Sequence, residues 1–135
     1  MPPRFSSITR DITVSRSCNS SQVALSFNCT TDECGAPGLI GHGLGLHGLP
    51  GPSGKVDAAA LAQALSEPDS SFVQAPAALS LTNATEYGVV YGAAEIATLA
   101  GLARSKGLGV HMEGARLVNA GAAGLDLKAL KGSHN

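Results

Sequence analysis

Apolar residues in the second half of the chain recur with the spacing of amphipathic helices. In Ala58–Ser66 they fall at i, i+3, i+4 and i+7, directly after Asp57, and this pattern predicts a helix that Asp57 caps. A second stripe lies in Ala93–Ser105 and consists of Ile96, Leu99, Ala100 and Ala103. Gly107 is expected to end this helix, because glycine readily takes the left-handed conformation at a helix C-terminus.

Shorter apolar runs predict strands on either side of the second helix. These runs are Ala77–Leu81 and Leu108–Met112, and Gln22–Phe27 is a further candidate. A strand, a helix and a strand in this order predict one right-handed β-α-β unit with parallel strands. Polar residues follow both strands, at Thr85–Glu86 and Glu113–Arg116. Because the carboxyl ends of parallel strands meet at one edge of a sheet, we expect these residues to converge on one crevice.

The remaining segments carry weaker signals. Residues 1–28 mostly lack a periodic apolar face, and we expect an unstructured or unrelated leader there rather than a transit peptide. Cys29–Pro37 is polar and rich in turn residues, and the following GHGLGLHG is not a Walker pattern, since no Lys-Ser/Thr follows it. A loop and a strand are therefore favoured there over a phosphate-binding loop. A short helix is expected after Asn119, and another within Leu125–Leu130.

Composition narrows the class of protein. A chain of 135 residues forms one domain at most, and with 4% aromatic residues and no Trp its core has few large anchors. The net charge of −1 and the scattered basic residues argue against a nucleic-acid partner, and no apolar run has the length of a membrane span. Cys18, Cys29 and Cys34 show no metal-type pairing, so we expect reduced thiols in a cytoplasmic protein without a metal site.

Three blocks of the sequence resemble the threonine aldolases, and they come in the order found in that family. His111–Ala120 (HMEGARLVNA) resembles the H-x-D-G-A-R-x-x-N-A segment, while Asp32–Pro37 (DECGAP) and Leu79–Tyr91 (LSLTNATEYGVVY) resemble two earlier segments. The threonine aldolases belong to the aromatic amino acid β-eliminating lyase and threonine aldolase group of pyridoxal-phosphate enzymes. The resemblance covers roughly Thr31 to Asp126.

This resemblance implies an α/β fold. It implies part of the three-layer α/β/α large domain of the fold type I pyridoxal-phosphate transferases, truncated at both ends, with residues 29–135 as a partial lyase domain. It also implies a short strand over Leu44–Leu49. The reaction implied is cleavage of a β-hydroxy-α-amino acid, such as threonine, to glycine and an aldehyde, by an enzyme that is a homo-oligomer in its intact form.

A pyridoxal-phosphate enzyme needs an acid against the pyridinium nitrogen and an arginine for the substrate carboxylate. The resemblance implies that Glu113 is the cofactor-binding acid and that Arg116 is the substrate-binding arginine. Glu113 departs from the family's aspartate by one methylene, which puts the distance to the ring nitrogen in question. The alternative for both residues is a local ion pair at a helix start, where the helix dipole favours the acid.

Other family features are missing or displaced. The position of the ring-stacking histidine falls on Asn28, which has no aromatic face. His42 and His47 are expected to be loop histidines, and His111 a packed or hydrogen-bonded residue within a strand. Nothing in Met1–Cys29 resembles the family's Gly/Thr-rich phosphate-binding stretch.

The family's Schiff-base lysine lies in an S-x-G-G-T-K-N stretch, and no such stretch occurs in this sequence. Lys128 and Lys131 are expected to be surface charges, so no catalytic residue is assigned. Three interpretations stay open: a fragment of an aldehyde-lyase, a truncated non-catalytic protein, and a piece of a related β-eliminating lyase.

Overall fold

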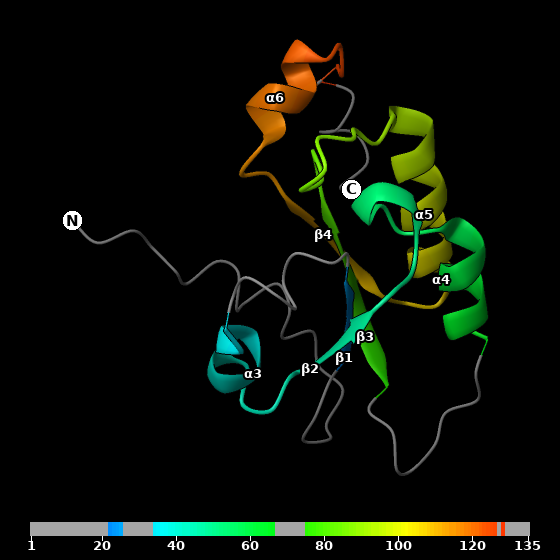
Figure 1. Ribbon diagram of the computed structural model, residues 1–135. Helices are drawn as coiled ribbons and strands as arrows, with labels where there is room; N and C mark the ends of the chain where they lie inside the picture. The colour runs from blue at the N-terminus through cyan, green and yellow to red at the C-terminus, as the bar shows by residue number, and fades with distance from the viewer. Residues whose placement is uncertain (1–21, 26–33, 67–74, 127, 129–135) are drawn as a thin grey trace.

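The structure is a computed structural model, and it describes residues 22–25, 34–66, 75–126 and 128 (Figure 1). Its elements in chain order are β1 (Gln22–Leu25), α3 (Ala36–Ile40), β2 (Gly45–Gly48), the 3-10 helix η1 (Pro52–Gly54), α4 (Ala58–Ala64), β3 (Pro76–Thr82), α5 (Ala93–Ser105), β4 (Gly109–Glu113) and α6 (Leu117–Ala122). The architecture is mixed α/β, as the sequence predicts. None of the described helices is long and apolar enough to cross a membrane.

The described strands form one parallel sheet in the order β2-β1-β3-β4. β1 confirms the strand expected in Gln22–Phe27, and it lies between β2 and β3 although it falls within residues 1–28. β2 confirms the strand expected in Leu44–Leu49. Since every pairing is parallel, all four strands end at the same edge of the sheet, and the segments that leave β3 and β4 begin there.

Helices α4 and α5 lie together on one side of the sheet, whereas α3 lies beside β2 (Figure 1). The core forms between α5 and the sheet, where Leu79 and Leu81 of β3 are fully buried. Side chains alternate along a strand, so Ser80 and Thr82 face the opposite side, and both are also buried. One face of β3 therefore packs the apolar core while the other presents polar groups.

Both helices that the apolar stripes predict are present. α5 has the predicted bounds, and all four residues of its stripe are buried. Gly107 follows it with φ of 76°, the left-handed conformation expected of a residue that ends a helix. Asp57 caps α4, because its Oδ1 accepts hydrogen bonds from the backbone N–H groups of Ala59 (2.9 Å) and Ala60 (3.0 Å). α4 ends at Ala64, two residues before the predicted end.

The glycine-rich segment between β1 and β2 differs from the prediction. We expected a turn-rich connection followed by a loop, but Ala36–Ile40 forms the helix α3. Pro37 occupies its first turn, where the missing N–H costs nothing, and a five-residue helix is too short to show an apolar period. His47 lies on β2 and is not the loop histidine that we expected. α6 also starts earlier than predicted, at Leu117.

Several predictions fall on positions for which the structure gives no description. They concern residues 1–21, Asn28, Cys29, half of Leu125–Leu130 (Leu127, Ala129 and Leu130), and Lys131.

The segment between β3 and α5 is held by a buried amide. Asn83 is completely buried, and its Oδ1 accepts a hydrogen bond from the backbone N–H of Tyr91 (3.1 Å). Its Nδ2 donates to the backbone carbonyl of Tyr91 (3.4 Å). The hydroxyl of Tyr91 in turn accepts from the backbone N–H of Val56, at the start of α4. The Asn83 side chain therefore closes the segment from residue 83 to residue 91, and the Tyr91 hydroxyl joins this segment to the helical layer.

We predict that Asn83→Ala lowers the free energy of unfolding by about 1–3 kcal/mol, because it leaves the buried N–H and C=O of Tyr91 without partners. Asn119→Ala is the matched control. Asn119 is an exposed residue of α6, so its truncation should change stability by less than about 0.5 kcal/mol. Urea unfolding followed by circular dichroism measures both values, and equal midpoints for the two variants would contradict the prediction.

Candidate functional site

The carboxyl ends of β3 and β4 bring the predicted polar residues together. Thr82 pairs with Glu113 at the last position of both strands. The backbone N–H of Asn83 then donates to the carbonyl of Glu113 (3.1 Å), which carries the pairing one residue further. The segments that follow, Asn83–Gly88 and Gly114–Arg116, therefore leave the sheet side by side. This confirms that the two segments converge.

Glu113 has one carboxylate oxygen in use and one without a partner. Oε1 accepts a hydrogen bond from the backbone N–H of Ala115 (2.6 Å), in the turn before α6. In the part of the chain that the structure describes, Oε2 is buried and has no hydrogen-bond partner. A buried carboxylate oxygen without a donor is costly, so such a group indicates a site that a ligand's N–H or cationic group can complete.

Arg116 stands at the start of α6 and reaches across to the other segment. Its Nη2 donates to Oε2 of Glu86 at 2.6 Å, and the side chains of Arg116 and Glu86 are 34% and 31% exposed. Within the described part of the chain, the ion pair of Arg116 is with Glu86 and not with Glu113. The local pair considered from the sequence is therefore not formed, although Glu113 does lie against the turn that begins α6.

A polar row runs along the sheet below these residues. Ser80 pairs with His111 in the register of β3 and β4, two positions before Thr82 and Glu113. The Oγ of Ser80 lies 2.8 Å from Nδ1 of His111, so the predicted hydrogen-bonded role of this histidine is confirmed. Because residues two apart share a strand face, Ser80, Thr82, His111 and Glu113 lie on the same face of the sheet.

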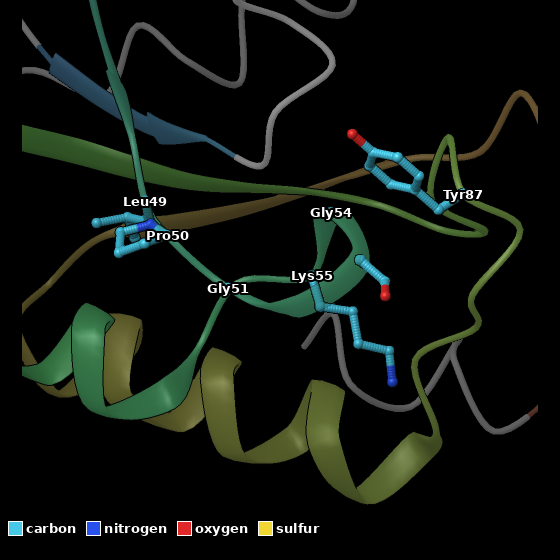
Figure 2. A pocket seen from close by; sticks show the side chains of 7 residues that line it. Leu49, Pro50, Gly51, Gly54, Lys55 and Tyr87 are labelled. Atoms are coloured by element: carbon cyan, nitrogen blue, oxygen red, sulfur yellow. The ribbon is translucent and has the colours of Figure 1, made fainter.

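A cavity of about 450 Å³, which was not predicted from the sequence, lies at the end of β2. Figure 2 shows its lining, in which the turn from Leu49 to Lys55 faces Tyr87 of the β3–α5 segment. The cluster of Pro and Gly residues at 50–54 is the signal that the sequence holds for this region, because such clusters mark turns. Neither Glu113 nor Arg116 lines this cavity.

Lys55 of this cavity is already paired. Its Nζ donates to both carboxylate oxygens of Glu95 (2.8 and 2.9 Å) and lies 5.1 Å from the centre of the Tyr91 ring. The hydrogen bond from Lys55, followed by that from the N–H of Gly92, lowers the pKa of Glu95. Burial raises the pKa of the Tyr91 hydroxyl. The ammonium group of Lys55 therefore connects the turn before α4 with Glu95 in the first turn of α5.

Within the described residues, no hydrogen bond or ion pair joins the other candidates to Glu113 or Arg116. His42 is exposed, with φ of 53°, and Lys128 is exposed. Cys34 is a free, exposed cysteine. The described residues contain no group of three or more His, Cys, Asp or Glu side chains that could hold a metal ion.

The chain is similar in sequence to proteins of known activity. The sequence model of the beta-eliminating lyase family matches residues 10–131. A low specificity L-threonine aldolase of Pseudomonas sp. (strain NCIMB 10558) is 31% identical over 117 residues, which are 78% of this chain and 34% of that relative. A low specificity L-threonine aldolase of Pseudomonas aeruginosa is 37% identical over 91 residues, which are 67% of this chain and 26% of that relative.

A solved structure agrees with the sequence matches. The threonine aldolase of Leishmania major superposes with a TM-score of 0.73 and 26% sequence identity, over 89% of this chain and 35% of that protein. This chain thus spans about a third of the length of the relatives it matches. The match to the family model covers far more than half of the chain, and the parallel α/β architecture agrees with it. The chain belongs to the beta-eliminating lyase family.

Proposed function

We propose that this chain provides the part of a pyridoxal-phosphate-dependent aldehyde-lyase that holds the cofactor's ring nitrogen and the substrate's carboxylate. The observation that carries the proposal is Oε2 of Glu113, which is buried at the carboxyl edge of the sheet and has no partner among the described residues. A protonated ring nitrogen is a cationic N–H donor of the kind this oxygen lacks. Glu113 therefore fits the ring nitrogen of this cofactor.

Glu113 would act by holding a proton on the ring nitrogen. Pyridoxal phosphate supplies an electron sink when it is bound, and a protonated ring is the better sink. Oε1 is fixed by the N–H of Ala115, so the carboxylate has one orientation, and its free oxygen is the one offered to a ligand. The carboxylate charge favours the protonated ring and needs no movement of the chain.

Arg116 would orient the substrate through its carboxylate. A guanidinium has five N–H donors in a planar fork, and Glu86 accepts from one of its nitrogens only. The remaining donors suffice for a two-pronged pair with a small carboxylate, which fixes the substrate's direction as well as its position. The partial exposure of Arg116 leaves a path for such a ligand.

The substrate class that we propose is β-hydroxy-α-amino acids such as threonine, cleaved to glycine and an aldehyde. Two relatives named low specificity L-threonine aldolase support this choice. The Glu86–Arg116 pair beside Glu113 supports it from the structure, because an arginine next to a cofactor-holding acid is suited to an amino acid's carboxylate.

A chimera tests the role of Glu113. Residues 31–126 of this chain replace the matching segment of the Pseudomonas aeruginosa relative, and threonine cleavage is assayed by the aldehyde formed. We expect the chimera to cleave threonine and Glu113→Gln to lower its turnover at least about tenfold, because the amide keeps the shape but not the charge; tenfold corresponds to ~1.4 kcal/mol of transition-state stabilisation.

Glu113→Asp is the matched variant for this test. It keeps the charge and should retain most of the turnover. If Glu113 is only a helix-start acid, Glu113→Gln should cost about 0.3–1 kcal/mol of stability and leave turnover nearly intact. That result would remove Glu113 from the site, and a well-folded chimera without any lyase activity would favour the non-catalytic interpretation.

Arg116→Lys in the same chimera should raise the Michaelis constant for threonine while the affinity for pyridoxal phosphate stays unchanged. Lysine keeps the positive charge but cannot form the planar fork that two carboxylate oxygens require. Initial rates over a range of threonine concentrations measure the first quantity, and a titration of the cofactor-free protein measures the second. An unchanged Michaelis constant would show that Arg116 does not bind the substrate.

A further inference from the structure

We infer that Thr85 is a positioning residue of the candidate site, which acts on Arg116 through its neighbour Glu86. The inference rests on the proposed role of Arg116 and goes beyond it, because it assigns the direction of the guanidinium to a buried residue that carries no charge. Thr85 and Glu86 lie in the segment between β3 and α5, whereas Arg116 follows β4. The direction in which Arg116 points is then set by a different segment from the one that carries it.

Arg116 needs a partner to point in one direction. An arginine side chain has several rotatable bonds, and an exposed one samples many rotamers unless a partner holds it. The side chain of Arg116 is about one third exposed, and its Nη2 donates to Oε2 of Glu86 at 2.6 Å. Because the guanidinium is planar, a bond at one nitrogen fixes its plane, and the remaining N–H groups face a defined direction. Glu86 therefore decides where a carboxylate can meet two donors at once.

Glu86 lies at the tip of a tight turn. The N–H of Gly88 donates to the carbonyl of Thr85 (2.9 Å), and the N–H of Thr85 donates to the carbonyl of Val89 (2.9 Å). These two bonds close the turn on itself, but they do not by themselves fix it to the rest of the protein. A closed turn can still rotate as a unit about its two ends, which would carry Glu86 away from Arg116. The turn therefore needs a contact outside its own residues.

The side chain of Thr85 supplies this contact. It is buried, and its Oγ1 donates to the carbonyl of Ser53 (2.9 Å) and accepts from the N–H of Val89 (3.2 Å). Ser53 lies in η1, 32 residues away in sequence. One hydroxyl thus uses both its donor and its acceptor to tie the turn that carries Glu86 to the segment before α4.

Thr85→Val isolates this role. It removes the hydroxyl, keeps the branched shape of the side chain, and changes neither charge of the ion pair between Glu86 and Arg116. Thr98→Val is the matched control, because Oγ1 of Thr98 donates to the carbonyl of Ala94 (2.9 Å), and the substitution removes the same kind of bond within a single helix. Thr85→Ser keeps the hydroxyl and should behave as the wild type.

The first measurement uses the full 135-residue chain and nuclear magnetic resonance. The side-chain Nε–H signal of Arg116, assigned by its loss in Arg116→Lys, reports the order of this side chain through its heteronuclear NOE. In the wild type and in Thr98→Val we expect a value near that of the backbone amides of α6. In Thr85→Val it should fall toward that of Arg104, an exposed arginine that has no ion pair among the described residues.

The second measurement uses the chimera and separates binding from turnover. Thr85→Val should raise the Michaelis constant for threonine about two- to fivefold, the ratio that one exposed charge pair supplies, and leave turnover nearly unchanged. Glu86→Ala should raise this constant as well, although the removal of a negative charge beside Arg116 would by itself lower it. In the Glu86→Ala background Thr85→Val should have no further effect, because Thr85 acts through Glu86.

An Arg116 signal that stays ordered in Thr85→Val or in Glu86→Ala would overturn the inference. A Michaelis constant that stays level or falls in Glu86→Ala would do the same, as would additive effects in the double variant. Circular dichroism shows that the variants fold; if Thr85→Val does not, Glu86→Ala decides, since the Glu86 side chain is partly exposed. A chimera without lyase activity refutes the proposed reaction, whereas the Arg116 signal involves neither the cofactor nor turnover and still tests this inference.

Discussion

The parallel register of β3 and β4 is the constraint on which the candidate site depends. Thr82 pairs with Glu113, so the two strands end at the same level and their following segments start beside each other. Glu86 and Arg116 are 30 residues apart in sequence, yet this register places them in contact. A shift of one residue would turn Glu113 to the apolar face, where α5 packs, because side chains alternate along a strand.

The two faces of β3 and β4 have different roles: one packs the apolar core, and the other carries the polar residues of the candidate site. Leu79 and Leu81 bury one face of β3 against the helical layer, and this burial of apolar surface stabilises the layer. On the other face, buried polar side chains form the row that ends at Glu113. Burying polar groups is costly unless they find partners, so this row is stabilised by bonds such as that between Ser80 and His111.

Anchoring of the β3–α5 segment links the fold to the candidate site. The buried amide of Asn83 holds Tyr91, and Thr85 holds the turn at Ser53. Only Glu86, Tyr87 and Gly88 remain at the exposed tip. The backbone at both ends of this tip is already ordered. Binding of a small ligand at the tip would therefore cost little conformational entropy of the chain.

The sequence alone determined the elements with a repeated apolar period. α5 was predicted with its bounds and its buried stripe, and the capped start of α4 was predicted from Asp57, because helix periodicity and capping are local properties. The resemblance carried by His111–Ala120 also indicated the family that the comparisons show. The convergence of the two polar segments followed from the parallel β-α-β order.

Only the tertiary structure decided the partners of these residues. The sequence did not show that Arg116 pairs with Glu86 or that Lys55 is held by Glu95. Nor did it show that Oε2 of Glu113 is buried and lacks a partner among the residues that the structure describes. Nor did it show α3, whose five residues are too few for a visible period. The ion pairs join residues that are far apart in sequence, and α3 is little more than one helical turn. Neither a long-range contact nor a single turn leaves a periodic signal along the sequence.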